Sequence, residues 1–374
     1  ALAALGGSAA IAAVEQPISP AAWQAHPLSR SVLDEQRVLT ERIADLEESL
    51  SKVQASTTAD GRLTAGRPRC TVFGRVFVDT CLMNQDALNR DQFGDAPGGT
   101  RFRSTRLGAR GDMGDATTWE ISLEFAGIDT MDEHTVQRTS ITNVYLQWND
   151  LPLIQKLRLG HIREPASLED MTSSRFYALP ERSVLATFIP GRNLGIRAMG
   201  HSEAEDATFA VGLFRDTPDM PALYDGDFGG HALTMRGTWL PWYDEATAGR
   251  SLLHLGGYYS FRDVDNDTLR FCRRGDTTFG PVIVDTGTMT GVVDWQLLGG
   301  EAAVVLGPFS LQSEYATAMV NRSGAADPRF DAVYVEATYF LTGENRVYNR
   351  PLGAFGRLHP RENAFRVRDE HGNV

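Results

Sequence analysis

The sequence predicts an all-β protein: an antiparallel transmembrane β-barrel preceded by a short coiled-coil helix. From about residue 70 onward, apolar and polar residues alternate with a period of two, which is the period of side chains along a β-strand. The alternating segments are about ten residues long, the length of a tilted strand that crosses a bilayer. No run reaches the ~20 consecutive apolar residues of a spanning helix, so a helical membrane protein is excluded.

The composition limits partners and cofactors. The 374 residues carry a formal net charge of -12, and this acidic balance argues against nucleic acid, which needs a basic face. Cys70, Cys81 and Cys272 match no zinc spacing, and we expect no metal and no cofactor. Cys70 and Cys81 lie on one predicted strand, roughly 35 Å apart at ~3.3 Å per residue, so we expect no disulfide between them unless the chain turns back.

The N-terminal region is predicted to contain three parts. Residues 1–30 are interpreted as a signal-peptide remnant and leader, because residues 1–14 are rich in Ala and Gly and end in small residues typical of a cleavage site. A flexible Ala/Gly terminus is the alternative. The initiator Met and the basic region of a signal are missing, so we expect the chain to be clipped here. Residues 31–56 are predicted to be helical, and residues 57–69, with Gly, Pro, Ser and Thr, a linker.

The predicted helix carries an a/d seam over about three heptads. Its apolar positions are Val32, Leu39, Ile43, Leu46, Leu50 and Val53. We interpret the seam as a parallel coiled coil that gathers protomers on the periplasmic side. The alternative is a lone amphipathic helix that lies on the rest of the protein.

Residues 70–374 are predicted to form the barrel domain. About twelve strands are expected near 70–80, 101–112, 117–126, 139–149, 155–163, 192–201, 207–215, 231–240, 251–263, 297–307, 309–321 and 329–342. The intervals 164–191 and 264–296 are expected to be long loops, and long outer loops that alternate with short turns are typical of membrane barrels. A soluble β-sandwich also alternates, but usually with shorter strands and fewer charges on its polar face.

The alternation assigns side chains to the two faces of the strands. Predicted to face outward toward lipid are Trp119, Leu123, Leu159, Leu233 and Trp239. Predicted to face inward are the acidic residues Glu120, Glu124, Glu314 and Glu336 and the basic residues Lys156, Arg158, Arg197 and Arg236. The inward face is therefore mixed in sign. Such charges can serve solutes, or they can pair across the lumen simply to satisfy one another.

Three segments together resemble the phosphate-selective porin O and P family. They are GHIREPASLEDMTSSRFYALPERS at 160–183 with PGRNLG at 190–195, LGGEAAVVLGPFSLQSEY at 298–315, and ATYFLTGEN at 337–345. The similarity runs from about Phe73 to Pro360. It implies a homotrimer of sixteen-stranded barrels in a Gram-negative outer membrane, whose third loop, here residues 164–190, folds into the lumen and narrows it.

The resemblance implies passive diffusion of small anions such as phosphate. The positions that match the family's constriction are Ser173, Ser174 and Arg182, with Arg175 beside them. The best-known phosphate-binding members carry a lysine three residues before the first serine, whereas this sequence has Asp170, which departs from the pattern and puts phosphate preference in doubt. An anion pore needs fixed donors and positive charge, which arginine forks and serine hydroxyls supply.

The candidate ligand-binding and constriction residues are therefore Ser173, Ser174, Arg175, Arg182, Arg163, Lys156, Arg158, Arg197 and Arg236. The partners expected are small anions as transported solute, outer-membrane lipid and two further copies of the chain, with no nucleic acid. Alternatives are a general or sugar-selective porin, and a structural outer-membrane protein tied to the cell wall by its coiled coil.

An enzyme is not expected. The sequence has no nucleophile elbow, phosphate loop or metal-spaced cluster. Glu120 and Glu124 share a strand face and could mimic a glycosidase pair, so an all-β hydrolase or lectin-like sandwich is the remaining alternative of that class.

The number of strands leads to a further expectation. The family implies sixteen, about twelve are predicted, and residues 361–374 have no alternating apolar face. We therefore expect that the final strands are missing from this chain. The first strand, near 72–79, and the last, near 330–341, should then both have free edges, because a closed barrel would pair them.

Overall fold

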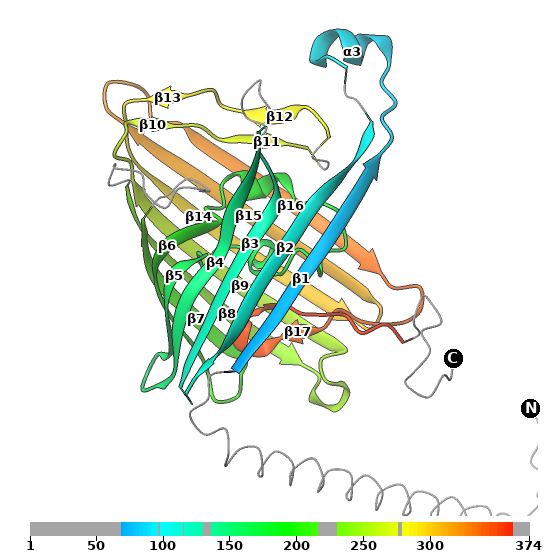
Figure 1. Cartoon of the computed structure of the whole chain (residues 1–374), viewed down its shortest axis with the longest axis vertical. Coiled ribbons are helices and arrows are strands. Elements are labelled where there is room, and N and C mark those ends of the chain that lie inside the picture. Colours follow the sequence, from blue (N-terminus) through cyan, green and yellow to red (C-terminus); the bar gives the residue numbers. More distant parts are fainter. Residues whose placement is uncertain are drawn as a thin grey trace, which may run out of the picture. The chain divides into compact units, whose positions relative to one another are not determined.

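The computed structural model describes residues 69–95, 98–114, 116–129, 136–215, 230–275 and 279–361. The predicted leader and coiled coil, and the predicted linker at 57–69 except for Arg69, which begins β1, lie outside this part. Its main feature is one antiparallel sheet of twelve strands, each paired with its neighbours along the chain (Figure 1). The strands are β1 (Arg69–Cys81), β2 (Gly99–Met113), β3 (Thr117–Asp129), β4 (Val136–Leu151), β5 (Gln155–Arg163), β6 (Arg192–His201), β7 (Ala207–Arg215), β8 (His231–Tyr243), β9 (Ser251–Asp263), β14 (Val292–Leu306), β15 (Phe309–Arg322) and β16 (Arg329–Tyr339). The predicted all-β fold is confirmed, and each predicted strand overlaps an observed one.

Small elements occupy the connections. The helices are α3 (Ala87–Phe93), α4 (Leu168–Met171), η1 (Val184–Thr187), η2 (Glu245–Thr247) and η3 (Arg350–Leu352). Three two-stranded sheets pair β10 (Thr268–Leu269) with β13 (Met289–Thr290), β11 (Cys272–Arg274) with β12 (Val282–Asp285), and β17 (Tyr348–Asn349) with β18 (Ala354–Phe355). None of the helices in the described part is long and apolar enough to cross a membrane.

Two details of the prediction are corrected. The interval 264–296 is not a plain loop, because it contains two of the two-stranded sheets and the start of β14 at Val292. The register shift between Val292 and Asp294 breaks the period-two pattern there, which hid the beginning of the strand. Helix α3 was also not predicted, since it is only 7 residues long; Asp86 caps it by accepting from the Asn89 amide.

The connections differ between the two ends of the sheet. At one end they are short, at 114–116, 152–154, 202–206, 244–250 and 307–308. At the other end lie longer segments, among them 164–191 and 264–291. This asymmetry is typical of outer-membrane barrels.

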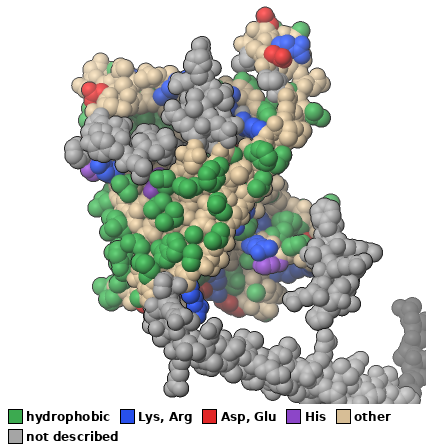
Figure 2. Space-filling view, in the orientation of Figure 1, with side chains coloured by type: hydrophobic (Ala, Val, Ile, Leu, Met, Phe, Trp, Pro, Cys, Tyr) green, Lys and Arg blue, Asp and Glu red, His purple; other side chains and the backbone are tan. Residues whose placement is uncertain are grey.

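The two faces of the sheet are reversed relative to a soluble protein. On the convex face Leu159 is 47% exposed and Trp239 is 54% exposed, as predicted, and Figure 2 shows apolar side chains over this surface. On the concave face charged and polar side chains such as Arg236 and Thr234 are buried. Water would favour the opposite arrangement, whereas a bilayer favours this one.

The sheet has two edges in the described part of the chain. Strand β1 pairs with β2 alone and β16 with β15 alone, so these twelve strands do not close on each other. The predicted free edges at the first and last strands are thus present. Cys70 and Cys81 lie at opposite ends of β1, and both are free, as is Cys272.

The lipid-facing assignment predicts a depth-dependent cost of charge. Leu298, near the middle of β14, is 51% exposed, and Leu153, in the 152–154 turn, is 95% exposed. Leu298→Arg should lower the free energy of unfolding in lipid vesicles by about 2–4 kcal/mol, because arginine at the bilayer midplane is costly. Leu153→Arg is the matched control and should change it little. Equal effects of the two substitutions would contradict the membrane orientation.

Candidate functional site

Residues 164–191, between β5 and β6, lie on the concave side of the sheet. The buried Glu164 carboxylate begins the segment and accepts hydrogen bonds from Arg262 Nη1 at 2.9 Å, from Asn193 Nδ2 at 2.7 Å and from the Thr234 hydroxyl. These three donors come from β9, β6 and β8. One carboxylate therefore ties the start of the segment to three strands.

The middle of the segment is held from the opposite part of the sheet. The Glu314 carboxylate of β15 accepts from the backbone amides of Leu168 at 3.1 Å and Glu169 at 2.8 Å, and from the Tyr334 hydroxyl at 2.6 Å. On the other flank, Arg75 Nη1 of β1 donates to Ser174 Oγ at 2.8 Å. Contacts with strands so far apart in the sheet are possible only for a segment inside the curl, where Figure 1 shows it.

Asp170 joins two of the predicted cations. Its carboxylate lies 3.3 Å from Arg163 Nε and 2.9 Å from Arg182 Nη2, and its side chain is nearly buried. Burial alone would raise the pKa of Asp170, but Arg163 and Arg182 outweigh it and hold the pKa below its ordinary value. Asp170 is therefore ionised at neutral pH and offsets part of the positive charge of both arginines.

A second carboxylate, that of Glu169, connects the two halves of the segment by hydrogen bonds. Glu169 accepts from the Ser183 amide and hydroxyl, both at 2.8 Å, and the Tyr177 hydroxyl donates to the Glu169 carbonyl at 3.1 Å. Burial raises the pKa of Glu169, and burial also raises the pKa of Tyr177 to about 12.

Arginines face one another across neighbouring strands on one wall of the concave face. The directly opposite pairs are Arg75 and Arg106 on β1 and β2, and Arg158 with Arg197 and Arg163 with Arg192 on β5 and β6. Like charges at directly opposite positions destabilise a sheet, so the positive charge concentrated on this wall lowers the stability of the fold.

Most partners of these arginines are neutral. Arg158 donates to Gln147 Oε1 at 2.8 Å and Arg192 to Asn143 Oδ1 at 2.9 Å, while Arg197 donates to the Arg163 carbonyl at 2.8 Å. These neutral contacts position the guanidinium groups without cancelling their charge.

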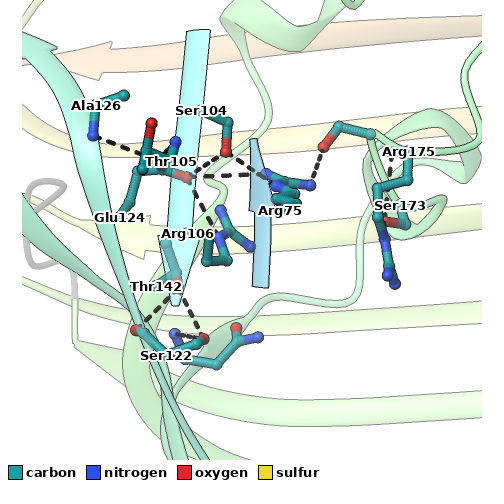
Figure 3. Close-up of polar contacts among 12 residues, drawn as sticks. Arg75, Ser104, Thr105, Arg106, Ser122, Glu124, Ala126, Thr142, Ser173 and Arg175 are labelled. Atoms are coloured by element: carbon teal, nitrogen blue, oxygen red, sulfur yellow. Dashed lines mark hydrogen bonds and ion pairs between the residues drawn. The ribbon is translucent and has the colours of Figure 1, made fainter. Parts of the chain in front are cut away.

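Glu124 is the carboxylate that reaches the first pair. It lies 3.3 Å from Arg106 and 4.0 Å from Arg75. Figure 3 shows Arg75 between the side chains of β2 and β3 and the segment that carries Ser173 and Arg175. In the Arg158–Arg197 pair, the hydrogen-bond partners are neutral. In the Arg163–Arg192 pair, Arg163 shares the Asp170 carboxylate with Arg182.

The facing wall is acidic. Glu301 and Glu314 are directly opposite on β14 and β15. Arg236 Nη2 lies 2.6 Å from Glu301, and His254 Nε2 lies 3.2 Å from the same oxygen. Arg236, one of the predicted site residues, therefore has its charge paired and is separate from the arginine wall.

Residues 344–356, after β16, form a second segment on the concave side. Tyr348 OH lies 2.6 Å from His254 Nδ1, Arg236 donates to the Gly353 carbonyl at 2.6 Å, and the Phe355 amide donates to Thr172 Oγ1 at 3.3 Å. Tyr348 and Phe355 pack with Leu168 in one apolar cluster. The sequence analysis did not predict that residues 344–356 enter the concave side. The turn at Arg350-Pro351-Leu352-Gly353 was the only feature of the sequence that indicated a change of direction there.

The remaining predicted site residues have varied places. Ser173 Oγ accepts from Arg175 Nε at 3.3 Å, and Arg175 is exposed. Lys156 lies at a register shift between β5 and β6. The structure thus groups Arg158, Arg163, Arg182 and Arg197 with Ser174 and Arg175 around the inner segment and leaves Arg236 apart. The missed arginines are Arg75, Arg106 and Arg192; Arg75 shares the period-two phase of Phe73 and Phe77, a signal that was present in the sequence.

Comparison with known proteins identifies the family. The model of the phosphate-selective porin O and P family matches residues 82–372. The chain belongs to this family. The predicted family and the Gram-negative outer membrane as its location are thereby confirmed. Proteins of this family are channels and not enzymes.

Individual relatives match at moderate identity. Porin O of Pseudomonas aeruginosa is 30% identical over 229 residues, which cover 54% of this chain and 50% of that protein. An uncharacterized protein of Caulobacter vibrioides is 26% identical over 275 residues, 70% of this chain and 51% of that protein. The chain spans about half the length of these relatives.

Solved porin structures are also similar. The outer membrane channel DcaP of Acinetobacter baumannii has a TM-score of 0.41 and 18% identity over 73% of this chain and 75% of that one. OprB of Pseudomonas putida has a TM-score of 0.41 and 12% identity over 76% and 78%.

The anchoring role of Glu164 generates a stability prediction. Glu164→Gln should lower the free energy of unfolding by about 3–5 kcal/mol, because Arg262 would stay buried without its carboxylate. Glu245→Gln, at the more exposed pair with Arg350, is the matched control and should change little. Urea unfolding in detergent micelles measures both. If the two variants unfold alike, Glu164 does not anchor the segment.

Proposed function

We propose that the chain forms the wall of an outer-membrane pore through which small anions diffuse passively, with the segment 164–190 narrowing its lumen. The observation that carries this proposal is the set of three opposed arginine pairs on the concave wall. A structural role alone would not favour like charges at directly opposite positions. A solute anion, in contrast, can interact with both members of each pair.

The segregation of charge supports anion passage. The opposed arginine pairs lie on β1, β2, β5 and β6, and the opposed glutamates lie on β14 and β15. Glu120 and Glu124 of β3 lie among the arginine strands and offset part of their charge. Anions would follow the arginine wall, where fixed donors replace part of their hydration shell. Ser174 adds a neutral donor on the inner segment.

Phosphate is one candidate solute, but Asp170 favours a broader preference. The family's lysine at this position would add a charge to Arg163 and Arg182, whereas Asp170 subtracts from both. We therefore infer a pore for small anions in general, with weak preference for phosphate over chloride. A sugar-selective pore and a cell-wall tether remain as outcomes of the test.

The test is conductance of the full chain in planar lipid bilayers. Stepwise current and a reversal potential of anion-selective sign under a KCl gradient are expected. Added phosphate should reduce the chloride current only modestly, and maltodextrins should not reduce it. Cation selectivity would overturn the anion proposal, and the absence of steps would favour the structural alternative.

Charge variants of the inner segment should shift selectivity in opposite directions. Asp170→Asn should raise the anion-to-cation permeability ratio several-fold, because Arg163 and Arg182 lose their shared countercharge, an effect on the order of 1 kcal/mol for a hydrated ion. Arg182→Ala should lower the ratio, since Asp170 keeps only one arginine. Asp91→Asn, on the exposed helix α3, is the control. Shifts of the same sign in both variants would contradict the role of this cluster.

Assembly is proposed to be a homotrimer, stabilised by the coiled coil at 31–56. Three heptads are marginal by themselves, so the helices should help trimers without determining the barrel. Deleting residues 31–56 should lower the trimer fraction in mild detergent while leaving the β-sheet circular dichroism unchanged. Sedimentation measures the fraction, and equal amounts of monomer from both chains would count against the proposal.

A further inference from the structure

Two neighbouring carboxylates of the inner segment have different surroundings. Asp170 pairs with Arg163 at 3.3 Å and with Arg182 at 2.9 Å. Glu169 accepts instead from two neutral groups, the amide and the hydroxyl of Ser183, both at 2.8 Å. Both side chains are buried, and among the described residues no cation forms an ion pair with Glu169. The two carboxylates therefore differ in what keeps them charged.

Their different surroundings follow from the short helix α4. Ser167 caps this helix by accepting from the Asp170 amide at 3.1 Å, and the buried Leu168 packs in the apolar cluster that includes β17 and β18. Consecutive residues of a helix do not share a face, so Glu169 and Asp170 point to different neighbours. Glu169 reaches Ser183 near the end of the segment, and Asp170 reaches the two arginines.

The charges around Glu169 come from several elements. Burial raises the pKa of Glu169 above its ordinary value, and the Ser183 hydrogen bonds, Arg182 and Arg273 of β11 offset this only in part. The other titratable groups that face Glu169 belong to its own segment, to β9, β15 and β16, and to the chain after β16. They are Asp170, Tyr177, Tyr258, Glu314, Tyr334 and Arg346. Glu169 therefore takes up a proton at a higher pH than an exposed glutamate does.

We propose that Glu169 determines the anion selectivity of the pore: its ionised carboxylate weakens selectivity at neutral pH, and its protonation in mild acid strengthens it. The ionised carboxylate offsets part of the charge of Arg182 and Arg273, which are in direct contact, since Arg273 Nη2 donates to the Arg182 carbonyl at 3.1 Å. Asp170 stays ionised between its two arginines, so Glu169 is the member of this turn that changes charge. The inference rests on the proposed pore, because it names the regulation of its constriction.

Protonation changes the charge of Glu169 without releasing the segment. The Ser183 amide can still donate to the carbonyl oxygen of a neutral carboxyl group, and the Ser183 hydroxyl can rotate to accept from its O–H. Glu314 and Arg75 continue to hold the segment from two other sides. We therefore expect the selectivity of the pore to change with pH while its single-channel steps persist.

The test is the reversal potential of the full chain in planar bilayers under a KCl gradient, from about pH 8 to about pH 5, a range in which an exposed glutamate stays mostly ionised. The anion-to-cation permeability ratio should rise about two- to threefold as the pH falls, because one negative charge beside the path is removed. Histidines titrate in the same range, so a variant must assign the shift.

Glu169→Gln is that variant, because glutamine resembles the protonated carboxyl group in shape and charge. It should show the raised permeability ratio already at about pH 8 and lose most of the further rise on acidification. Glu245→Gln, at the exposed pair with Arg350, is the matched control and should keep the shift of the unchanged chain. A full pH shift in Glu169→Gln, or an unchanged ratio in that variant at the higher pH, would overturn the proposal.

Infrared difference spectra of the full chain in lipid vesicles detect the proton without conduction. Acidification over the same range should produce the C=O stretching band of a protonated carboxyl group, and part of this band should be missing from Glu169→Gln but not from Glu245→Gln. Conductance steps without a Glu169 band would overturn this proposal and keep the pore. A Glu169 band without conductance steps would remove the pore, and with it the selectivity role, while the protonation of Glu169 would stand.

Discussion

The arrangement of the whole sheet depends on one constraint: its convex face is apolar, so every polar side chain of the strands must find partners on the concave side. A bilayer cannot satisfy charged groups, and the buried arginines and glutamates therefore satisfy one another or the segments that enter the curl. Glu164 and Glu314 show the result, because each carboxylate belongs to one wall or segment and accepts hydrogen bonds from another. The inner segment is in this sense part of the polar core.

This constraint separates charges that hold the fold from charges that remain for solutes. Arg236 and Arg262 each have a carboxylate within 3 Å, so their charge is used in the interior. The arginine pairs of β5 and β6 have mostly amide and carbonyl partners, which direct the guanidinium but leave its charge. An arginine that points inward is therefore not necessarily available to bind a solute anion. It is available only where its hydrogen-bond partner is neutral and not a carboxylate.

The strands could be predicted from sequence because lipid imposes a strict period of two, and each of the twelve predicted strands has an observed counterpart. The prediction missed the start of β14, because a bulge near Val292 breaks that period. Within the candidate site, the phase placed Arg158, Arg197 and Arg236 inward, but it could not tell that Arg236 faces Glu301 from a strand distant in sequence. The segment at 344–356 was missed for a related reason, since its contacts with His254 and Thr172 have no local pattern.

The two segments inside the curl depend on each other. Phe355 packs against Leu168 in the same apolar cluster, and its amide donates to Thr172, so the second segment supports the turn that carries Glu169 and Asp170. Tyr348 connects that support to His254, and His254 to Glu301. Because the interior is closely packed, a shift of residues 344–356 would move the helix α4 and with it the Asp170 pairs. The position of the inner segment is therefore supported by a part of the chain more than 150 residues away, while the charge of Asp170 is balanced locally by Arg163 and Arg182.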